Sequence, residues 1–154
     1  MTDRVAIRRL PTGVPGLDQI LGGGLPEFSF NIIAGAPGAG KTTLAQQIMF
    51  ALAGPDRSAL YFTVVGEPPL KMLRYQQQFT FFDVARVTES VRYVNLSQEV
   101  VSGTLEKLLG RIVQEVEATS PGVVIVDSFR TVAQAGDVSS GRAGPEHGEA
   151  REGE

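Results

Sequence analysis

The residues best suited to do chemistry form one short glycine-rich segment that ends in a lysine and a threonine. The pattern G-x-x-x-x-G-K-[ST] is matched by Gly35, Ala36, Pro37, Gly38, Ala39, Gly40, Lys41 and Thr42. Glycine permits backbone conformations that other residues avoid, so successive N–H groups can turn inward around phosphate oxygens. The pattern therefore predicts a loop that binds the phosphates of a nucleotide.

The residues that close this segment have separate predicted roles. Lys41 would bring a mobile positive charge to the β- and γ-phosphates of ATP, which makes it a binding and a catalytic candidate. The Thr42 hydroxyl is suited to ligate Mg²⁺, and Thr43 would contact the α-phosphate through its hydroxyl or backbone N–H. The alternative is a plain glycine-rich turn before a helix. An apolar segment before the loop and a helical pattern after it favour phosphate binding.

Two acids that follow apolar runs are candidates for the same site. Asp127 closes the run at residues 123–126, where an acid would hold the magnesium, usually through water. The alternative is an acid that marks where a buried strand meets solvent, and the glycine-rich loop favours the metal role. Glu67 follows the run at residues 59–65 and would activate an attacking water. It would equally favour the N-terminus of the next helix, and spacing leaves both roles open.

The elements that must position these residues alternate along the chain. Apolar, β-prone runs predict strands at residues 28–34, 59–65, 91–96 and 122–127, the first and last being buried. Helical patterns occupy residues 17–21, 41–53, 70–79 and 104–118. On the last helix, one apolar face is expected at Leu105, Leu108, Leu109, Ile112, Val113 and Val116. Such alternation predicts an α/β fold with three layers and a mostly parallel sheet.

Charge and composition narrow the classes of function. The chain has 154 residues and a net charge of −3, and all of that charge lies in residues 136–154. Residues 1–135 hold 12 acids and 12 bases, so a basic nucleic-acid surface is not expected and DNA is an unlikely partner. The chain has no cysteine and a single histidine, His147, which excludes thiol chemistry and disfavours imidazole catalysis.

The ends of the chain predict its location and one region without a core. Residues 1–10 lack the apolar stretch of a secretory signal, and the chain has no apolar run long enough to span a membrane. A cytoplasmic location is therefore expected, with no membrane partner. Residues 136–154 contain five glycines and no Leu, Ile or Phe. We predict that this acidic, glycine-rich tail is disordered.

The combined motifs resemble the RecA-like P-loop ATPases of the KaiC and RadA group, and KaiC most closely. Before the loop, the resemblance rests on Thr12-Gly13, Gly16-Leu17-Asp18 and Leu21-Gly22-Gly23-Gly24-Leu25-Pro26. After it, the matching residues are Leu60-Tyr61-Phe62-Thr63, Glu67-Pro68-Pro69, Leu73-Arg74 and Val126-Asp127-Ser128. The resemblance runs from about Pro11 to about Ala133. It implies an N-terminal extension at residues 1–10 and a partial ATP-binding domain at residues 11–135.

The resemblance also implies an activity and an assembly. Members of the group bind ATP with Mg²⁺ between the subunits of a ring, usually a hexamer, and hydrolyse it slowly. Some also phosphorylate their own serine and threonine residues. The group usually has two adjacent glutamates after the second strand, whereas this chain has Gly66-Glu67. The resemblance fades after Ala133, which implies a truncated module whose sheet is incomplete at the C-terminal end.

Three hypotheses follow for the function. The first is a KaiC-like ATPase with Mg·ATP on residues 35–43, Asp127 on the metal and Glu67 on the water. The second is a DNA-repair ATPase of the RadA type, which shares the same loop. The third is a nucleotide-binding remnant without catalysis that acts by assembly with full-length relatives. The first is the interpretation that we adopt.

Overall fold

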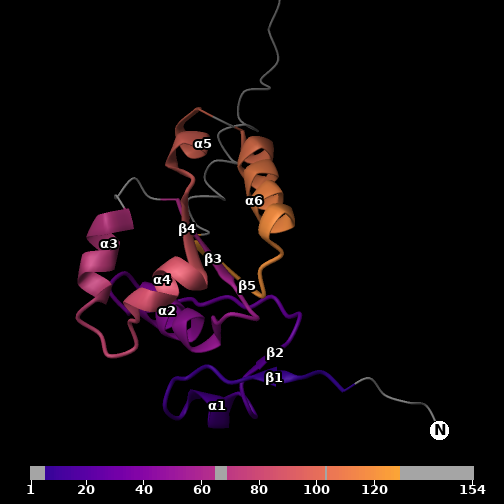
Figure 1. The fold of residues 1–154 in the computed structure, drawn as a ribbon, viewed down its shortest axis with the longest axis vertical. Coiled ribbons are helices and arrows are strands. Elements are labelled where there is room, and N and C mark those ends of the chain that lie inside the picture. Colours follow the sequence, from indigo (N-terminus) through magenta and orange to yellow (C-terminus); the bar gives the residue numbers. More distant parts are fainter. Residues whose placement is uncertain (1–5, 65–68, 103, 129–154) are drawn as a thin grey trace, which may run out of the picture.

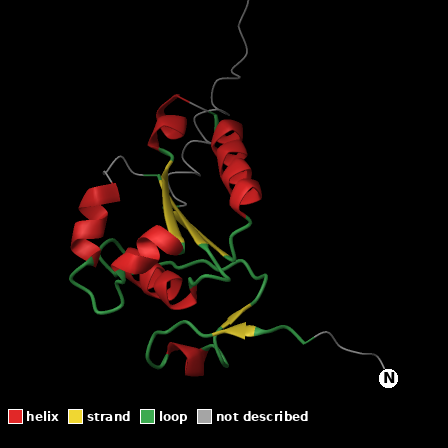
Figure 2. Cartoon of the chain, viewed as in Figure 1, coloured by secondary structure: helices red, strands yellow, loops and turns green. Residues whose placement is uncertain are grey.

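The computed structural model describes residues 6–64, 69–102 and 104–128, which form an α/β fold (Figures 1 and 2). In chain order its elements are β1 (Arg9–Leu10), α1 (Leu17–Ile20), β2 (Leu25–Pro26), α2 (Lys41–Leu52), β3 (Ala59–Thr63), α3 (Pro69–Gln76), α4 (Val84–Glu89), β4 (Val91–Asn95), α5 (Ser97–Ser102), α6 (Leu105–Thr119) and β5 (Val123–Asp127).

The main sheet has the order β4-β3-β5, and both of its pairings are parallel. Every residue of β3 is buried, because this strand lies in the centre of the sheet. The register places Thr63, the last residue of β3, beside both Asn95 and Asp127. Parallel pairing therefore brings the carboxyl ends of all three strands to one edge, where ligands bind in α/β sheets of this type.

Helices cover both faces of this sheet and confirm the predicted three layers (Figure 1). On one face, Met49 and Phe50 of α2 pack with Tyr61 and Val91, and α3 and α4 add Met72 and Val87. On the other face, Leu108 of α6 packs with Leu60 and Phe62 of β3, Val94 of β4 and Leu96, which follows β4. Alternation along β3 thus sends one set of side chains to each core.

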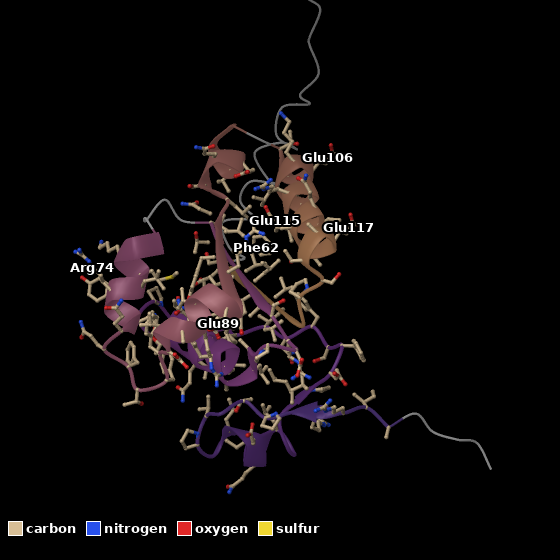
Figure 3. The ribbon with its side chains drawn as sticks, viewed as in Figure 1. Phe62, Arg74, Glu89, Glu106, Glu115 and Glu117 are labelled. Atoms are coloured by element: carbon tan, nitrogen blue, oxygen red, sulfur yellow. The ribbon has the colours of Figure 1, made fainter. Side chains whose placement is uncertain are left out.

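The expected apolar face of α6 is only partly correct. Leu108 is fully buried, and Leu105, Ile112 and Val116 pack against the same core, but Leu109 and Val113 are 45% and 52% exposed. Glu115 is buried in their place, and Figure 3 shows it on the sheet side of α6 while Glu117 points away. The buried carboxylate is paired with Arg111 at 2.7 Å and Arg92 at 3.2 Å. These pairs satisfy a charge that apolar periodicity does not predict.

The prediction of a buried strand at residues 28–34 is wrong. This segment has no strand conformation, and Phe28, Phe30 and Ile32 are 100%, 81% and 75% exposed. The physical reason is pairing, since both sides of β3 are taken by β4 and β5 and residues 28–34 pair with neither outer strand. β5 is also less covered than expected, because Val124 is 42% exposed.

The helices α4 and α5 were not expected from apolar periodicity, because each is only six residues long. A capping signal precedes α4, since the side chain of Asp83 accepts a hydrogen bond from the backbone N–H of Ala85 at 3.0 Å. The other main helices and strands begin and end within a few residues of their expected limits. Short elements of this kind are better indicated by caps than by periodicity.

The segment before the main sheet is held by a compact hydrogen-bond network. The antiparallel pair β1–β2 lies beside the main body in Figure 2. Asp18 Oδ1 accepts hydrogen bonds from the backbone N–H and the hydroxyl of the buried Thr12, at 2.8 and 2.7 Å. Gly13 (φ +68°) follows and packs against α2, where an added Cβ would lie 2.5 Å from the Cβ of Ala51. The motif therefore fixes the entering chain on the helix that carries Lys41.

A first prediction concerns pH. The hydrogen bonds from the Thr12 hydroxyl and N–H lower the pKa of Asp18 below its ordinary value of 3.8. The carboxylate therefore stabilises the folded state fully above pH 3.8, and this stabilisation is lost as pH falls through the lower folded pKa. We expect Asp18→Asn to lower the urea midpoint at about pH 7 and to differ less from the parent at about pH 3. The exposed Asp56, changed to Asn, is the control; an Asp18→Asn defect of the same size at both pH values would contradict the prediction.

Candidate functional site

The glycine-rich loop at residues 35–40 joins the exposed segment 28–34 to the first residue of α2. Gly38 and Gly40 have φ angles of +78° and +84°, a left-handed conformation that disfavours other residues. Gly40 is the N-cap of α2, so the loop turns directly into the positive end of the helix dipole. This geometry suits an anion at the start of α2.

The side-chain nitrogen of Lys41 lies over the loop. Its Nζ donates hydrogen bonds to the carbonyl oxygens of Gly35 and Ala36 at 3.0 and 2.8 Å. The side chain is thus folded back over the first two residues of the segment that the sequence identified. Both contacts are exposed to solvent, and a phosphate is a charged acceptor that binds an ammonium more strongly than a neutral carbonyl does, so Nζ can exchange them for a phosphate.

Thr42 and Asp127, the two predicted metal ligands, are brought together from distant parts of the described chain. The Thr42 hydroxyl donates a hydrogen bond of 2.7 Å to Asp127 Oδ2, across 85 positions of sequence. Thr42 lies in the first turn of α2, and Asp127 ends β5. The structure therefore places the end of the last strand beside the phosphate loop.

A third member of this cluster, Tyr61, was missed by the sequence analysis. Its phenolic hydroxyl also donates to Asp127 Oδ2, at 2.7 Å, and the whole side chain is buried. Burial and the nearby Asp127 carboxylate raise the pKa of Tyr61 far above its ordinary value of 10, so the phenol remains a donor. The position of Tyr61 in its strand was the one signal available. Residues two apart on a strand share a face, so Tyr61 lies on the same face as Thr63, the last residue of β3.

The donor chemistry fits magnesium. Asp127 offers a carboxylate and Thr42 a hydroxyl, and Mg²⁺ is usually held by one or two carboxylates plus waters and substrate phosphates. Thr63, beside Asp127 in the sheet, is buried and its hydroxyl has no hydrogen-bond partner among the described residues. Within the same part of the chain, no cluster of three His, Cys, Asp or Glu residues is present.

The remaining predicted residues have different outcomes. Ala36, Pro37 and Ala39 lie in the exposed loop, and Ala39 N–H donates to the Ala36 carbonyl at 3.2 Å. Thr43 lies in the first turn of α2, and its contact with a nucleotide stays a prediction. Glu67 lies outside the described residues, so its role also stays a prediction.

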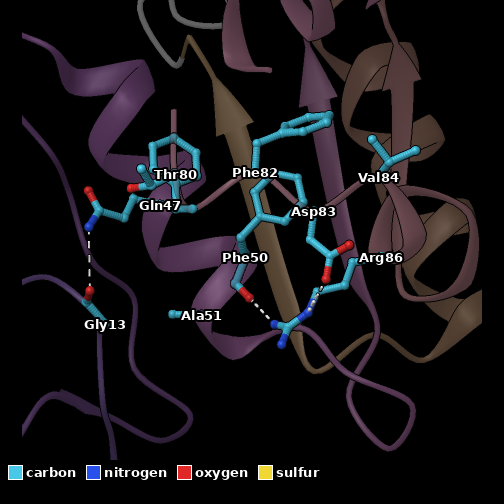
Figure 4. A pocket seen from close by; sticks show the side chains of 10 residues that line it. Gly13, Gln47, Phe50, Ala51, Thr80, Phe82, Asp83, Val84 and Arg86 are labelled. Carbon is cyan, nitrogen blue, oxygen red and sulfur yellow. Dashed lines mark hydrogen bonds and ion pairs between the residues drawn. The ribbon is translucent and has the colours of Figure 1, made fainter. Parts of the chain in front are cut away.

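A separate open cavity of about 500 Å³ lies between the second half of α2, Gly13 and residues 80–86 (Figure 4). It is lined by Gly13, Gln47, Phe50, Ala51, Thr80, Phe81, Phe82, Asp83, Val84 and Arg86. Arg86 forms an ion pair with Asp83 at 3.4 Å and donates to the carbonyls of Phe50 and Ala53. Its charge is therefore used to tie α4 to the end of α2. The lining contains no residue of the predicted nucleotide site.

Three features occur together here: a parallel sheet, a glycine-rich loop that leads into a helix, and an aspartate at the end of a strand beside that helix. Together they define the class of P-loop nucleotide-binding proteins. The sequence profile of the family described as "ATPase: KaiC" matches residues 10–143. The chain belongs to this KaiC family of P-loop ATPases, which confirms the resemblance found in its motifs.

Individual relatives agree with this assignment. DNA repair protein RadA of Mycobacterium tuberculosis is 32% identical over 126 residues, which cover 82% of this chain and 23% of RadA. A UPF0273 protein of Thermotoga maritima is 28% identical over 144 residues, covering 82% and 57% of the two chains. The crystal structure of a KaiC-like protein from Pyrococcus horikoshii matches with a TM-score of 0.69 and 25% identity, over 84% and 59% of the two chains. The chain thus spans about a quarter of RadA.

No helix in the described residues is both long and apolar enough to cross a membrane.

A second prediction tests the contact at the centre of the site. Thr42→Val removes one of the donors to Asp127 Oδ2 and keeps the β-branched shape, so we expect a loss of about 1 kcal/mol in the free energy of unfolding. Thr43→Val is the matched control in the same helical turn and is expected to change stability by less than about 0.5 kcal/mol. Urea unfolding measures both, and equal effects would show that the contact does not stabilise the fold.

Proposed function

We propose that this chain binds ATP with Mg²⁺ and hydrolyses it slowly, through a nucleotide-binding unit at residues 11–135. The single observation that carries the proposal is the convergence of Thr42 and Asp127 beside the loop at residues 35–40. Membership of the KaiC ATPase family supports the same reading. A cytoplasmic location of the protein fits this function.

Each predicted residue has a separate role in this proposal. The amides of residues 35–40 and the Lys41 ammonium hold the phosphates, with the N-terminus of α2 adding its dipole. The Thr42 hydroxyl and the Asp127 carboxylate, which lie together at the start of α2, would hold the magnesium. When bound, magnesium would supply positive charge that offsets the negative charge of the phosphates. Glu67 accepts the proton of the attacking water.

The active form that we propose is a ring of identical subunits, as the family resemblance implies. Serine/threonine autophosphorylation is an activity for which the family resemblance is the only support. The body of the chain carries balanced charge, so no strong repulsion opposes association between copies.

Two alternative functions can be distinguished from this proposal by measuring ATP turnover. The RadA relative, 32% identical and described as a DNA repair protein, favours an ATPase that acts with DNA. Turnover stimulated by single-stranded DNA would support that reading, and the neutral body of the chain argues against it. The other alternative is a remnant that binds nucleotide and acts by assembly with full-length relatives; nucleotide binding with turnover equal to buffer would support it.

Lys41→Ala tests the phosphate site. The variant loses the positive charge that Nζ holds beside Gly35 and Ala36, so we expect it to abolish detectable binding of a fluorescent ATP analogue. Lys107→Ala, on the exposed side of α6, removes the same charge elsewhere and should bind as the parent does. Parent-like affinity in Lys41→Ala would overturn the proposal.

Glu67→Gln separates hydrolysis from binding. Loss of the general base is expected to reduce magnesium-dependent turnover by about 100-fold or more while the analogue still binds. Glu106→Gln, an exposed acid in the first turn of α6, is the control. Phosphate release measures turnover, and an unchanged rate in Glu67→Gln would remove this residue from the mechanism.

A further inference from the structure

We propose that Tyr61 is a positioning residue that orients the Asp127 carboxylate for magnesium. This inference rests on the proposed function and adds to it a residue from β3, the central strand. The phenol donates to Asp127 Oδ2 at 2.7 Å, and the same oxygen accepts the Thr42 hydroxyl at 2.7 Å. Two donors that arrive from a strand and a helix define the direction of the carboxylate.

The register explains how Tyr61 reaches this oxygen. Tyr61 pairs with Ile125 in the sheet, so Asp127 lies two residues further along the neighbouring strand and on the same face. The tyrosine ring therefore runs along the sheet toward the carboxyl edge and delivers its hydroxyl there. A phenylalanine in this position would fill the same core without reaching the carboxylate.

The ring has little freedom to move. Tyr61 is fully buried in the core cluster under α2, and its ring centroid lies 5.3 Å from that of Tyr93. Gln46, also fully buried, follows Thr42 by one turn of α2, and Tyr93 donates to its Oε1 at 3.4 Å. A locked ring fixes its hydroxyl, which is the property that a positioning residue needs.

A purely structural role explains this arrangement less well. Burying a phenol is costly unless its hydroxyl is hydrogen-bonded, and an apolar ring would pack without that cost. Tyr61 meets the cost by bonding the carboxylate that we propose as a metal ligand. A fixed donor of this kind orients a metal-binding group.

The experiment compares Tyr61→Phe with Tyr93→Phe. Both variants remove one hydroxyl from a tyrosine of the same core cluster, in which Tyr61 is fully and Tyr93 partly buried, but only Tyr61 contacts Asp127. Binding of a fluorescent ATP analogue is titrated with free Mg²⁺, and circular dichroism checks the fold. We expect the half-saturating Mg²⁺ concentration to rise about tenfold or more in Tyr61→Phe and to remain near the parent value in Tyr93→Phe. Binding of the analogue in EDTA should be unchanged in both.

A measurement on the parent sequence keeps the inference testable if Tyr61→Phe folds poorly. The chain has three tyrosines, Tyr61, Tyr75 and Tyr93, so 3-fluorotyrosine labelling gives three ¹⁹F resonances. The variants Tyr75→Phe and Tyr93→Phe assign them. Adding Mg²⁺ to the nucleotide-bound protein should shift the Tyr61 resonance most, because its hydroxyl bonds the metal-binding carboxylate.

The outcomes separate this inference from the proposed function. A parent protein that binds no nucleotide would overturn the proposed function and this inference together. A parent protein that binds with magnesium dependence, combined with a parent-like Mg²⁺ titration in Tyr61→Phe, would overturn only the role of Tyr61. In that same protein, a Tyr61 resonance whose chemical shift does not change when magnesium is added would also overturn the role of Tyr61.

Discussion

Two hydroxyl groups converge on one carboxylate oxygen, Asp127 Oδ2, and this convergence joins the parts of the site. Thr42 comes from the start of α2, Tyr61 from the middle of β3, and Asp127 from the end of β5. Each hydrogen bond is 2.7 Å long and ends on a charged acceptor, which makes it stronger than a bond between neutral groups. The helix after the phosphate loop is thereby fixed against the strand that carries the acid.

The rest of the fold serves this arrangement. Parallel pairing of β5 with β3 brings Asp127 beside Thr63 at the carboxyl edge of the sheet. The apolar core between α2 and the sheet fixes the position of the helix relative to the strands. The Thr12–Asp18 network then holds the entering chain on α2 through the close contact of Gly13 with Ala51. The opposite core, with α6 and the paired Glu115, supports the back of the same strands.

Much of the fold, and the approach of Asp127 to the phosphate loop, were predictable from the sequence. Continuous apolar runs at β3 and β5, and the spacing of the phosphate loop, indicated the layers and placed Thr42 and Asp127 in one site. The strand expected at residues 28–34 failed because composition shows β-propensity but does not show which partner a strand pairs with. Tyr61 was missed because a tyrosine within an apolar run looks like core, and only register reveals that its hydroxyl reaches Asp127. Glu115 was missed for a related reason, since its arginine partners come from two different elements.

The most direct test of the central claim is calorimetry of the unmodified chain with a non-hydrolysable ATP analogue, once with Mg²⁺ and once with EDTA. A cluster in which Thr42, Tyr61 and Asp127 prepare a metal site predicts tighter binding when magnesium is present. Equal affinity in both conditions, or no heat of binding in either, would contradict the account.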